Sequence, residues 1–228
     1  MSVISDLGEF VFPRRCHICD GILQSGEKYV CTSCLARMPR TGYHHMANNP
    51  MEQRFAGLFP FSRATALFFY ARGAEISELM QDLKYRRFRG LGRFLGELAA
   101  DELLPTGFLT DVEAIVPVPI HRMKLAVRGY NQAMEIARGL SGRAALPVVR
   151  NLKARRPHHT QTRLSLEERH NNLKGVFQFC GAEHEPRRNF LILDDVCTTG
   201  STLTAAAEAL LSAIPDACIS LLAIGVTF

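Results

Sequence analysis

Residues 190–202 carry the side chains in this sequence that are best suited to chemistry. An apolar stretch, Phe-Leu-Ile-Leu, runs into two adjacent carboxylates, Asp194 and Asp195, and then into a loop rich in hydroxyl groups. Carboxylates at the end of a strand can accept hydrogen bonds from the vicinal hydroxyls of a ribose. Their charge can also stabilise an oxocarbenium ion that develops on the sugar. We therefore expect Asp194 and Asp195 to be the catalytic residues.

The loop Val-Cys-Thr-Thr-Gly-Ser-Thr that follows these carboxylates has the composition of a phosphate site. Backbone N–H groups at the start of a helix have no intrahelical partner, so they can donate to an anion together with the hydroxyls. Gly200 lets the backbone approach the phosphate closely. Single residues of this kind often merely cap a helix, so it is the whole string that predicts a site. The expected phosphate-binding residues are Cys197, Thr198, Thr199, Gly200, Ser201 and Thr202.

A second loop with anion-binding chemistry follows another apolar stretch. Residues 116–119 are Val-Pro-Val-Pro, and after them come His-Arg-Met-Lys and then Arg-Gly-Tyr-Asn-Gln. A cation-rich loop that opens a helix suits a second anion such as diphosphate. The expected diphosphate-binding residues are Arg122, Lys124, Arg128 and Lys84.

Four of the seven cysteines form two C-x-x-C pairs near the N-terminus. Each pair places two sulfur atoms on one tight turn, and two such turns fill the four positions of a tetrahedral zinc ion. The first residues carry no secretory signal, so metal ligation in a cytoplasmic protein is favoured over disulfide bonds. We expect a structural Zn²⁺ held by Cys16, Cys19, Cys31 and Cys34.

The net charge of +5 and the pI of about 8.9 favour acidic ligands such as phosphates, diphosphates or nucleic acid. Two basic clusters, within 84–93 and within 153–159, contribute to this charge. They could form a diphosphate or nucleic-acid surface with Tyr85, Phe88 and Phe94 stacking on bases, or they could be solvated side chains around core aromatics. Residues 153–162 could also close over a substrate. No apolar run approaches the roughly 18–20 residues that span a bilayer, so no membrane insertion is expected.

Short apolar stretches alternate with amphipathic ones from about residue 64 onward, and this order positions both loops. Strands are expected at 64–70, 114–118, 190–193 and 218–226, and helices at 75–85, 91–98, 129–140 and 203–214. The alternation predicts an α/β fold with a doubly wound, mostly parallel sheet, in which ligands bind at the carboxyl ends of the strands. We expect a four-cysteine module at 1–45, a linker at 46–62 and the α/β domain at 63–228.

Several of these stretches resemble known families. Residues 190–202 resemble the 5-phosphoribosyl 1-diphosphate-binding motif of type I phosphoribosyltransferases. Pro-x-Pro before Arg-Gly-Tyr-Asn-Gln, with Leu83-Lys84-Tyr85 and Thr160-Gln161, resembles the ComF family, which joins a zinc module to a phosphoribosyltransferase-like domain. The resemblance implies a type I phosphoribosyltransferase-like fold with an N-terminal zinc-ribbon-like module. It also implies that the two adjacent aspartates contact the ribose hydroxyls while Mg²⁺ accompanies the diphosphate.

Three functions are compatible with these expectations. The first is an enzyme that transfers the phosphoribosyl group from 5-phosphoribosyl 1-diphosphate to an acceptor that the sequence does not identify. The second is a non-catalytic sensor of 5-phosphoribosyl 1-diphosphate that binds single-stranded DNA or competence proteins during DNA uptake, as the resemblance implies. The third, a plain zinc-ribbon nucleic-acid binder, leaves the motifs after residue 63 unexplained.

Overall fold

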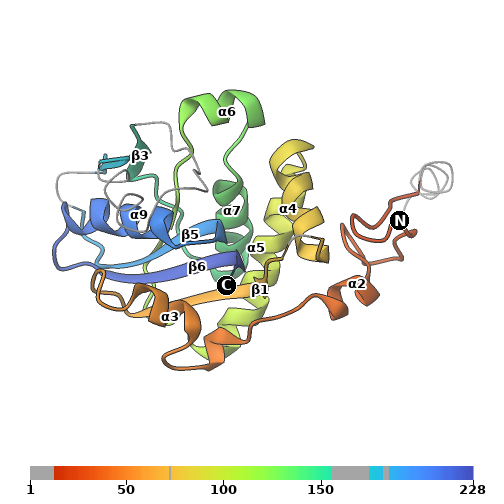
Figure 1. The fold of residues 1–228 in the computed structure, drawn as a ribbon, viewed down its shortest axis with the longest axis horizontal. Helices are drawn as coiled ribbons and strands as arrows, with labels where there is room; N and C mark the ends of the chain where they lie inside the picture. Colours follow the sequence, from red (N-terminus) through yellow and green to blue (C-terminus); the bar gives the residue numbers. More distant parts are fainter. Residues whose placement is uncertain (1–12, 72, 156–174, 182–184, 228) are drawn as a thin grey trace.

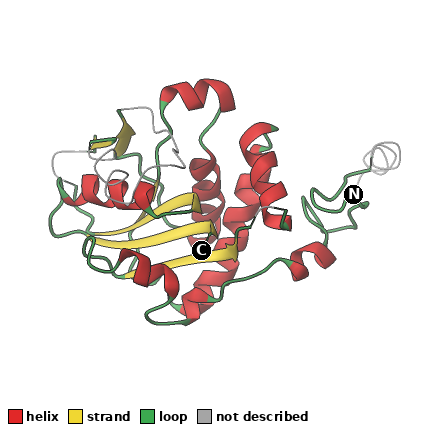
Figure 2. Ribbon diagram, in the orientation of Figure 1, coloured by secondary structure: helices red, strands yellow, loops and turns green. Residues whose placement is uncertain are grey.

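The computed structural model describes residues 13–71, 73–155, 175–181 and 185–227. A four-stranded parallel sheet of order β1-β6-β5-β2 lies between the helices of the α/β part of the fold (Figures 1 and 2). Its strands are β1 (Arg63–Phe69), β6 (Cys218–Val226), β5 (Asn189–Cys197) and β2 (Ala114–Pro117). Their apolar residues are buried almost without interruption, as in a sheet that is covered on both faces.

Helices pack on both faces of the sheet. On one face lie α4 (Glu75–Tyr85), α5 (Arg89–Leu103) and α7 (Gln132–Ala144), which share a core with the side chains of Leu191 and Leu193. On the other face lie α3 (Pro50–Phe55) and α9 (Ser201–Leu211), which share a second core with Phe190 and Ile192. The alternation of β5 side chains between the two cores confirms the predicted α/β class with a doubly covered parallel sheet.

Two glycines let α5 and α7 pack in close contact. A Cβ atom on Gly96 would lie 1.9 Å from the carbonyl oxygen of Ile136, and one on Gly139 would lie 1.9 Å from that of Arg93. Neither position can therefore carry a side chain. The close packing fixes α7 beside the sheet, and α7 begins directly after the cation-rich loop.

The segment expected as a linker, 46–62, contains the short helix α3. Asn49 caps this helix together with Glu52, and Pro50 occupies its first turn, where a missing N–H costs nothing. Met51 and Phe55 are fully buried in the second core. Part of this segment is thus packed against the sheet, while the division of the chain at residues 45 and 62 stays a prediction.

Several element boundaries differ from the expectation; α5, for example, was expected at 91–98 and spans Arg89–Leu103. Two of these differences affect the site. The helix expected from residue 129 begins at Gln132, because Gly129 has a left-handed φ of +78° and ends a separate helix, α6 (Arg122–Arg128). Strand β5 continues to Cys197, because its pairing with β6 extends that far, so Asp194 and Asp195 belong to the strand. In the described part of the chain, the remaining short elements are α2 (Thr32–Arg37), η1 (Tyr43–His45), η2 (Leu104–Thr106) and the antiparallel pair β3 (Leu152–Ala154) and β4 (Phe177–Phe179).

Most of the stretch expected as a closing loop, with the Thr160-Gln161 motif, lies outside the described residues. Across the helices that are described, none combines the length and the apolar character needed to cross a membrane.

Candidate functional site

The two predicted anion loops lie side by side because their strands are neighbours. β2 pairs in parallel with β5, and Pro117 at the end of β2 is the partner of Leu193. Both loops therefore leave the same edge of the sheet, where parallel sheets bind ligands. Between them is an open pocket of about 260 Å³. Its lining includes the side chains of Lys84, Lys124, Arg128, Asp194, Asp195, Thr198 and Thr202, together with those of Tyr70, His121, Asn131 and Gln132.

The carboxylates of Asp194 and Asp195, which are adjacent in the sequence, both line this pocket. The backbone N–H of Asp195 donates to Asp194 Oδ1 at 2.9 Å, and that of Val196 donates to Asp195 Oδ1 at 2.7 Å. Burial, and secondly the charge of Asp195, raise the pKa of Asp194 to about 7. The pair can thus hold a proton near neutral pH, and it presents carboxyl oxygens to any hydroxyl groups in the pocket.

Lys84 and helix α6 supply the cationic wall of the pocket. The Lys84 ammonium lies 3.2 Å from Asp195 Oδ2. Burial by itself would lower the pKa of Lys84, but the charges of Asp195 and Asp194 outweigh it and raise that pKa. Lys124 has a lowered pKa because it is partly buried and lies near Arg128. Arg122, the fourth predicted cation, lines a neighbouring groove instead of this pocket.

The hydroxyl-rich loop turns sharply into helix α9. Gly200 adopts φ +82° just before the helix, and a Cβ atom there would lie 2.8 Å from the ring of Phe55. Thr198 and Thr202 line the pocket, whereas the hydroxyls of Thr199 and Ser201 bond to each other at 2.9 Å. The N–H groups in the first turn of α9 have no intrahelical partner and face this end of the sheet. The loop therefore retains the donors of an anion site.

Cys197 lies behind the loop and does not line the pocket. It is buried, and this burial raises the pKa of its thiol to about 11. Its carbonyl oxygen accepts a bond from the backbone N–H of Thr227. Cys197 thus supports the loop from the core side and offers no thiolate to a ligand.

Arg54 of helix α3 is a positioning residue that the sequence did not point to. Its guanidinium donates to the carbonyl oxygens of Thr198 at 2.5 Å and of Thr227 at 2.6 Å, and to Cys197 Sγ at 3.6 Å. Through these bonds, Arg54 links the hydroxyl-rich loop at Thr198 to the segment after β6 at Thr227. Position 54 carries no local signal, because its partners are more than 140 residues away.

Asn131 and Tyr130 position the second loop, and both belong to the Arg-Gly-Tyr-Asn-Gln stretch. The Asn131 amide donates to the carbonyl oxygen of Val118 at 2.9 Å, which ties the start of α7 to the end of the Pro-x-Pro segment. The Tyr130 hydroxyl donates to the carbonyl oxygen of Leu83, one residue before Lys84. The stretch was singled out as a motif, but these roles depend on contacts that only the fold creates.

Most of the first basic cluster is engaged within the protein. Arg86 pairs with Asp82 at 3.2 Å, and Arg93 pairs with Glu135 at 3.0 Å. The three aromatic residues of this region have different environments. Phe88 and Phe94 contact the cysteine module, whereas Tyr85 is 69% exposed. Most cations of this cluster are therefore held by contacts within the protein. Lys84 alone reaches the pocket.

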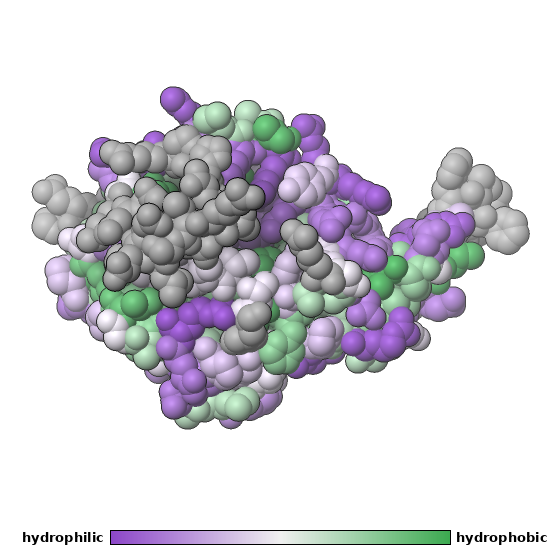
Figure 3. All heavy atoms as spheres, viewed as in Figure 1, coloured by the Kyte–Doolittle hydropathy of each residue, from purple (hydrophilic) through white to green (hydrophobic). Residues whose placement is uncertain are grey.

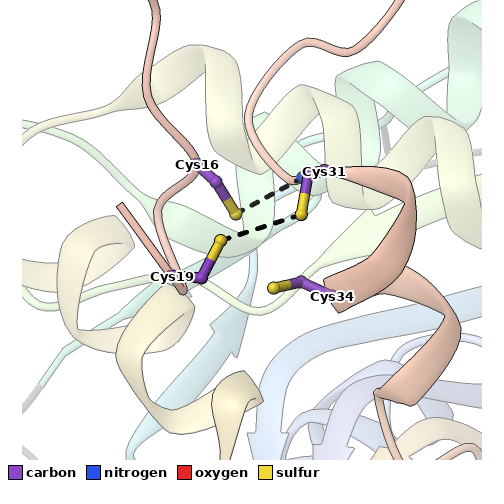
Figure 4. Close-up of side chains that lie close together, drawn as sticks. All are labelled: Cys16, Cys19, Cys31 and Cys34. Atoms are coloured by element: carbon purple, nitrogen blue, oxygen red, sulfur yellow. Dashed lines mark hydrogen bonds between the residues drawn. The ribbon is translucent and has the colours of Figure 1, made fainter. Parts of the chain in front are cut away.

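The four cysteines of the N-terminal module converge on one point (Figure 4). Their sulfur atoms all lie within 4.8 Å of one another, and Cys19 Sγ is 3.8 Å from Cys31 Sγ. Four thiolates about 2.3 Å from a zinc ion would be about 3.8 Å apart in a tetrahedron. Although burial opposes it, backbone N–H groups hold the pKa of Cys16 at about 7. The arrangement fits a structural zinc ion with no open coordination position.

The cysteine module is joined to helices α4 and α5. His17 Nδ1 lies 2.6 Å from Asp82 Oδ2, and the His17 ring meets the Phe88 ring edge-on at 4.7 Å. A Cβ atom on Gly90 would lie 1.8 Å from the Tyr29 hydroxyl, so the first turn of α5 is in direct contact with the module. Cys16 and Cys34 belong to the same hydrophobic core as α4 and α5. Zinc in the module would thus stabilise the helix that carries Lys84.

Similarity to known proteins extends over most of the chain. The chain is 30% identical to competence protein F of Haemophilus influenzae over 208 residues, which cover 84% of this chain and 88% of that protein. It is 28% identical to the DNA utilization protein YhgH of Escherichia coli K12, over 86% of this chain and 83% of that protein. The protein of the same description from Shigella flexneri is also 28% identical, with the same coverage. No family model matches the chain.

Proposed function

The chain belongs to the competence protein F (ComF) family, and from this we propose that it acts in DNA uptake or DNA utilisation through a 5-phosphoribosyl 1-diphosphate site. The observation that carries the proposal is one pocket with three kinds of group. Two adjacent carboxylates, a hydroxyl-rich helix start and three cations line it together. Each kind matches one part of this ligand: the ribose hydroxyls, the 5′-phosphate and the diphosphate.

The ligand would lie across the carboxyl ends of β5 and β2. Its 5′-phosphate would accept bonds from Thr198, Thr202 and the first N–H groups of α9. Its ribose hydroxyls would donate to Asp194 and Asp195, and its diphosphate would lie against Lys84, Lys124 and Arg128. Gly200 supports this placement, because its left-handed backbone turns the loop without a side chain between backbone and phosphate.

The same arrangement suits transfer of the phosphoribosyl group to an acceptor. The bond between C1 of the ribose and the diphosphate oxygen breaks, the acceptor forms a bond to C1, and the diphosphate leaves with the electron pair of the broken bond. The two carboxylates stabilise the positive charge on the sugar, and the cations stabilise the negative charge on the leaving group. The protein therefore contributes positioning and electrostatics, and no covalent intermediate is needed.

Magnesium fits this pocket as a companion of the substrate. Among the described residues, the four-cysteine cluster is the sole group of three or more His, Cys, Asp or Glu side chains arranged to hold a metal. Magnesium typically binds through one or two carboxylates together with substrate phosphates, and Asp194 and Asp195 are suitable ligands of that kind. It would neutralise part of the diphosphate charge. The thiolate site, in contrast, suits zinc and a reducing compartment, so we also propose a cytoplasmic location.

Calorimetry with 5-phosphoribosyl 1-diphosphate and magnesium tests the binding site. We expect wild-type protein to bind and Asp194→Asn/Asp195→Asn to lose at least tenfold in affinity, because both acceptors of the ribose hydroxyls are weakened. Asp101→Asn/Asp111→Asn is the matched control, since both of these aspartates are exposed. Equal affinity in wild type and in the double variant of the pocket would overturn the assignment.

Release of diphosphate separates the enzyme from the non-catalytic sensor. An enzyme supplied with candidate acceptors releases diphosphate continuously, and the release depends on Asp194 and Asp195. A sensor binds the same ligand with the same sensitivity to these variants but releases no diphosphate above the rate of a protein-free control. Binding without release of diphosphate would therefore favour the sensor over the enzyme and would leave the assignment of the binding site unchanged.

A further inference from the structure

A second groove borders the proposed 5-phosphoribosyl 1-diphosphate pocket and has a different chemical character. Its volume is about 440 Å³, within the range of about 300–1,000 Å³ of small-molecule sites. It shares Pro119, Ile120, Asn131 and Ala154 with the first pocket, so the two cavities adjoin along the loop after β2. Figure 3 shows hydrophilic side chains gathered between α6 and α4 on the face viewed there.

The walls of this groove are strongly basic. Five cations line it: Arg89, Arg122, Arg138, Arg150 and Lys153. Of the described residues that line it, Glu135 is the single acidic one; its carboxylate is only 3% exposed and is paired with Arg138 at 2.6 Å and with Arg93 at 3.0 Å. That carboxylate is therefore already neutralised, and the cations dominate the potential in the groove.

Three of the five cations are available to a ligand. Arg89 donates to the carbonyl oxygen of Gly129 at 3.0 Å, and Arg138 is held by Glu135. Within the part of the chain that the structure describes, no carboxylate or carbonyl partner is found for the side chains of Arg122, Arg150 or Lys153, and all three are exposed. Cations that lie together without acidic partners favour binding of a polyanion.

The groove is also lined by apolar residues, which a simple phosphate site does not require. They are Ile120, Leu125, Met134 and Leu152 together with Pro117 and Pro119, and we call them the apolar floor. Flat nucleobases bury their faces on apolar side chains and on guanidinium planes, while their phosphates pair with Lys and Arg. An acidic peptide would use the cations but leave most of this floor uncovered.

We infer that this groove binds a nucleotide unit, with the base on the apolar floor and the phosphate on Arg122, Arg150 and Lys153. The unit can come from a free nucleotide or from a single strand of nucleic acid, since both carry the same base and phosphate. A ligand here lies directly beside the first pocket. If the proposed phosphoribosyl transfer occurs, its acceptor therefore belongs to this chemical class, a step that rests on the proposed function.

Fluorescence anisotropy with a labelled single-stranded hexanucleotide tests the inference without any 5-phosphoribosyl 1-diphosphate. The test variant is Arg150→Gln/Lys153→Gln. The matched control is Arg63→Gln/Arg143→Gln, which removes two exposed cations from outside the groove. We expect wild type and control to bind alike, and the test variant to lose about tenfold in affinity or more. Each neutralised phosphate contributes about −0.7 to the slope of log K against log salt, so the slope should fall in magnitude by about 1.4 in the test variant.

Competition distinguishes the two sources of the nucleotide unit. Displacement of the hexanucleotide by a nucleoside monophosphate supports a free nucleotide as occupant, and failure of the monophosphate to compete supports a unit within a strand. Inorganic phosphate competing as well as the monophosphate would show that the base contributes nothing and would overturn the inference. Absence of hexanucleotide binding at 50 mM salt, or an equal loss in the control variant, would overturn it as well. None of these outcomes depends on whether the neighbouring pocket binds 5-phosphoribosyl 1-diphosphate.

Discussion

Lys84 and Asp195 form an ion pair across the pocket, with 3.2 Å between the lysine Nζ and the aspartate Oδ2. Their side chains are 21% and 15% exposed, so water screens the pair only in part. The pair joins the last turn of α4 to the end of β5. It thereby connects the helix that contacts the cysteine module to the carboxylates that we assign to the ribose.

The Lys84 ammonium should be needed for binding of the diphosphate. We expect Lys84→Gln to weaken binding of 5-phosphoribosyl 1-diphosphate at least tenfold by calorimetry, because one charge-assisted contact contributes about 1.5–3 kcal/mol. Lys28→Gln is the control, since Lys28 also forms an ion pair, with Glu97 at 2.9 Å, but lies in the cysteine module. Equal losses in both variants would mean that Lys84 acts through general surface charge and does not contact the ligand.

The stability of the protein should depend on pH through Asp194. Its pKa is raised from 3.8 to about 7 in the folded chain, mainly by burial. Between these values the folded state holds a proton that the unfolded state has lost, so the free energy of unfolding falls as pH rises from about 4 to about 7. We expect Asp194→Asn to remove this contribution, which thermal unfolding at pH 5, 6, 7 and 8 can measure. A difference in Tm between wild type and variant that stays constant over this range would contradict the prediction.

Gly200 should tolerate no side chain. Alanine at this position would adopt a left-handed backbone, which costs roughly 1–2 kcal/mol, and its Cβ atom would meet the Phe55 ring. We expect Gly200→Ala to lower both Tm and the affinity for 5-phosphoribosyl 1-diphosphate. Gly142→Ala is the control, because Gly142 lies in α7 and a Cβ atom there would meet nothing within 4 Å beyond the local helix backbone and its chain neighbours. That substitution should raise stability by about 0.5–1 kcal/mol and leave affinity unchanged.

Arg54 should stabilise the hydroxyl-rich loop through its bonds to backbone carbonyl oxygens. Arg54→Met removes the donors to the Thr198 and Thr227 carbonyl oxygens, and leaving such groups unpaired costs about 1–3 kcal/mol. We expect a lower free energy of unfolding in urea and weaker binding of 5-phosphoribosyl 1-diphosphate. Arg63→Met, which loses one exposed bond of 3.3 Å to Gly107, should change neither by a comparable amount. Full affinity in Arg54→Met would show that the loop keeps its shape without this residue.

Removal of zinc should destabilise more than the cysteine module. The module shares a hydrophobic core with α4 and α5, and His17 lies 2.6 Å from Asp82 of α4. We expect about one zinc per chain by elemental analysis, and a lower Tm both after chelation and in Cys19→Ser. The control is Cys218→Ser, since Cys218 is exposed and lies at the start of β6, outside the cluster. Equal zinc content in Cys19→Ser and Cys218→Ser would rule out the four-thiolate site.

The strongly patterned parts of the fold could be predicted from the sequence. Helix α4 and strand β6 have the expected boundaries, because their apolar residues recur with the period of a helix or fill a buried strand without interruption. Both C-x-x-C pairs converge as their spacing suggests. The order of elements was sufficient for the α/β class, because a parallel strand requires a crossover and a helix usually provides it.

Elements with little periodicity were missed. Helix α3 has only six residues, and its position is determined by the Asn49 cap and by burial of Met51 and Phe55 against the sheet. Helix α6 lies within a stretch expected as a loop, and its residues Arg122 and Lys124 line different cavities. Arg122 consequently faces the neighbouring groove, although the sequence placed both residues at one anion.

The chemistry around residues 190–202 was determined by the sequence itself, because adjacent carboxylates, small hydroxyls and a glycine retain their properties in any fold. The tertiary structure decided which distant groups complete that site. Lys84 reaches Asp195 across 111 positions because α4 and β5 share one hydrophobic core, and Arg54 reaches the Thr198 carbonyl because Phe55 of α3 lies against Gly200 at the start of α9. Such contacts depend on three-dimensional packing of elements that are far apart in the chain, and no local pattern in a single sequence encodes them.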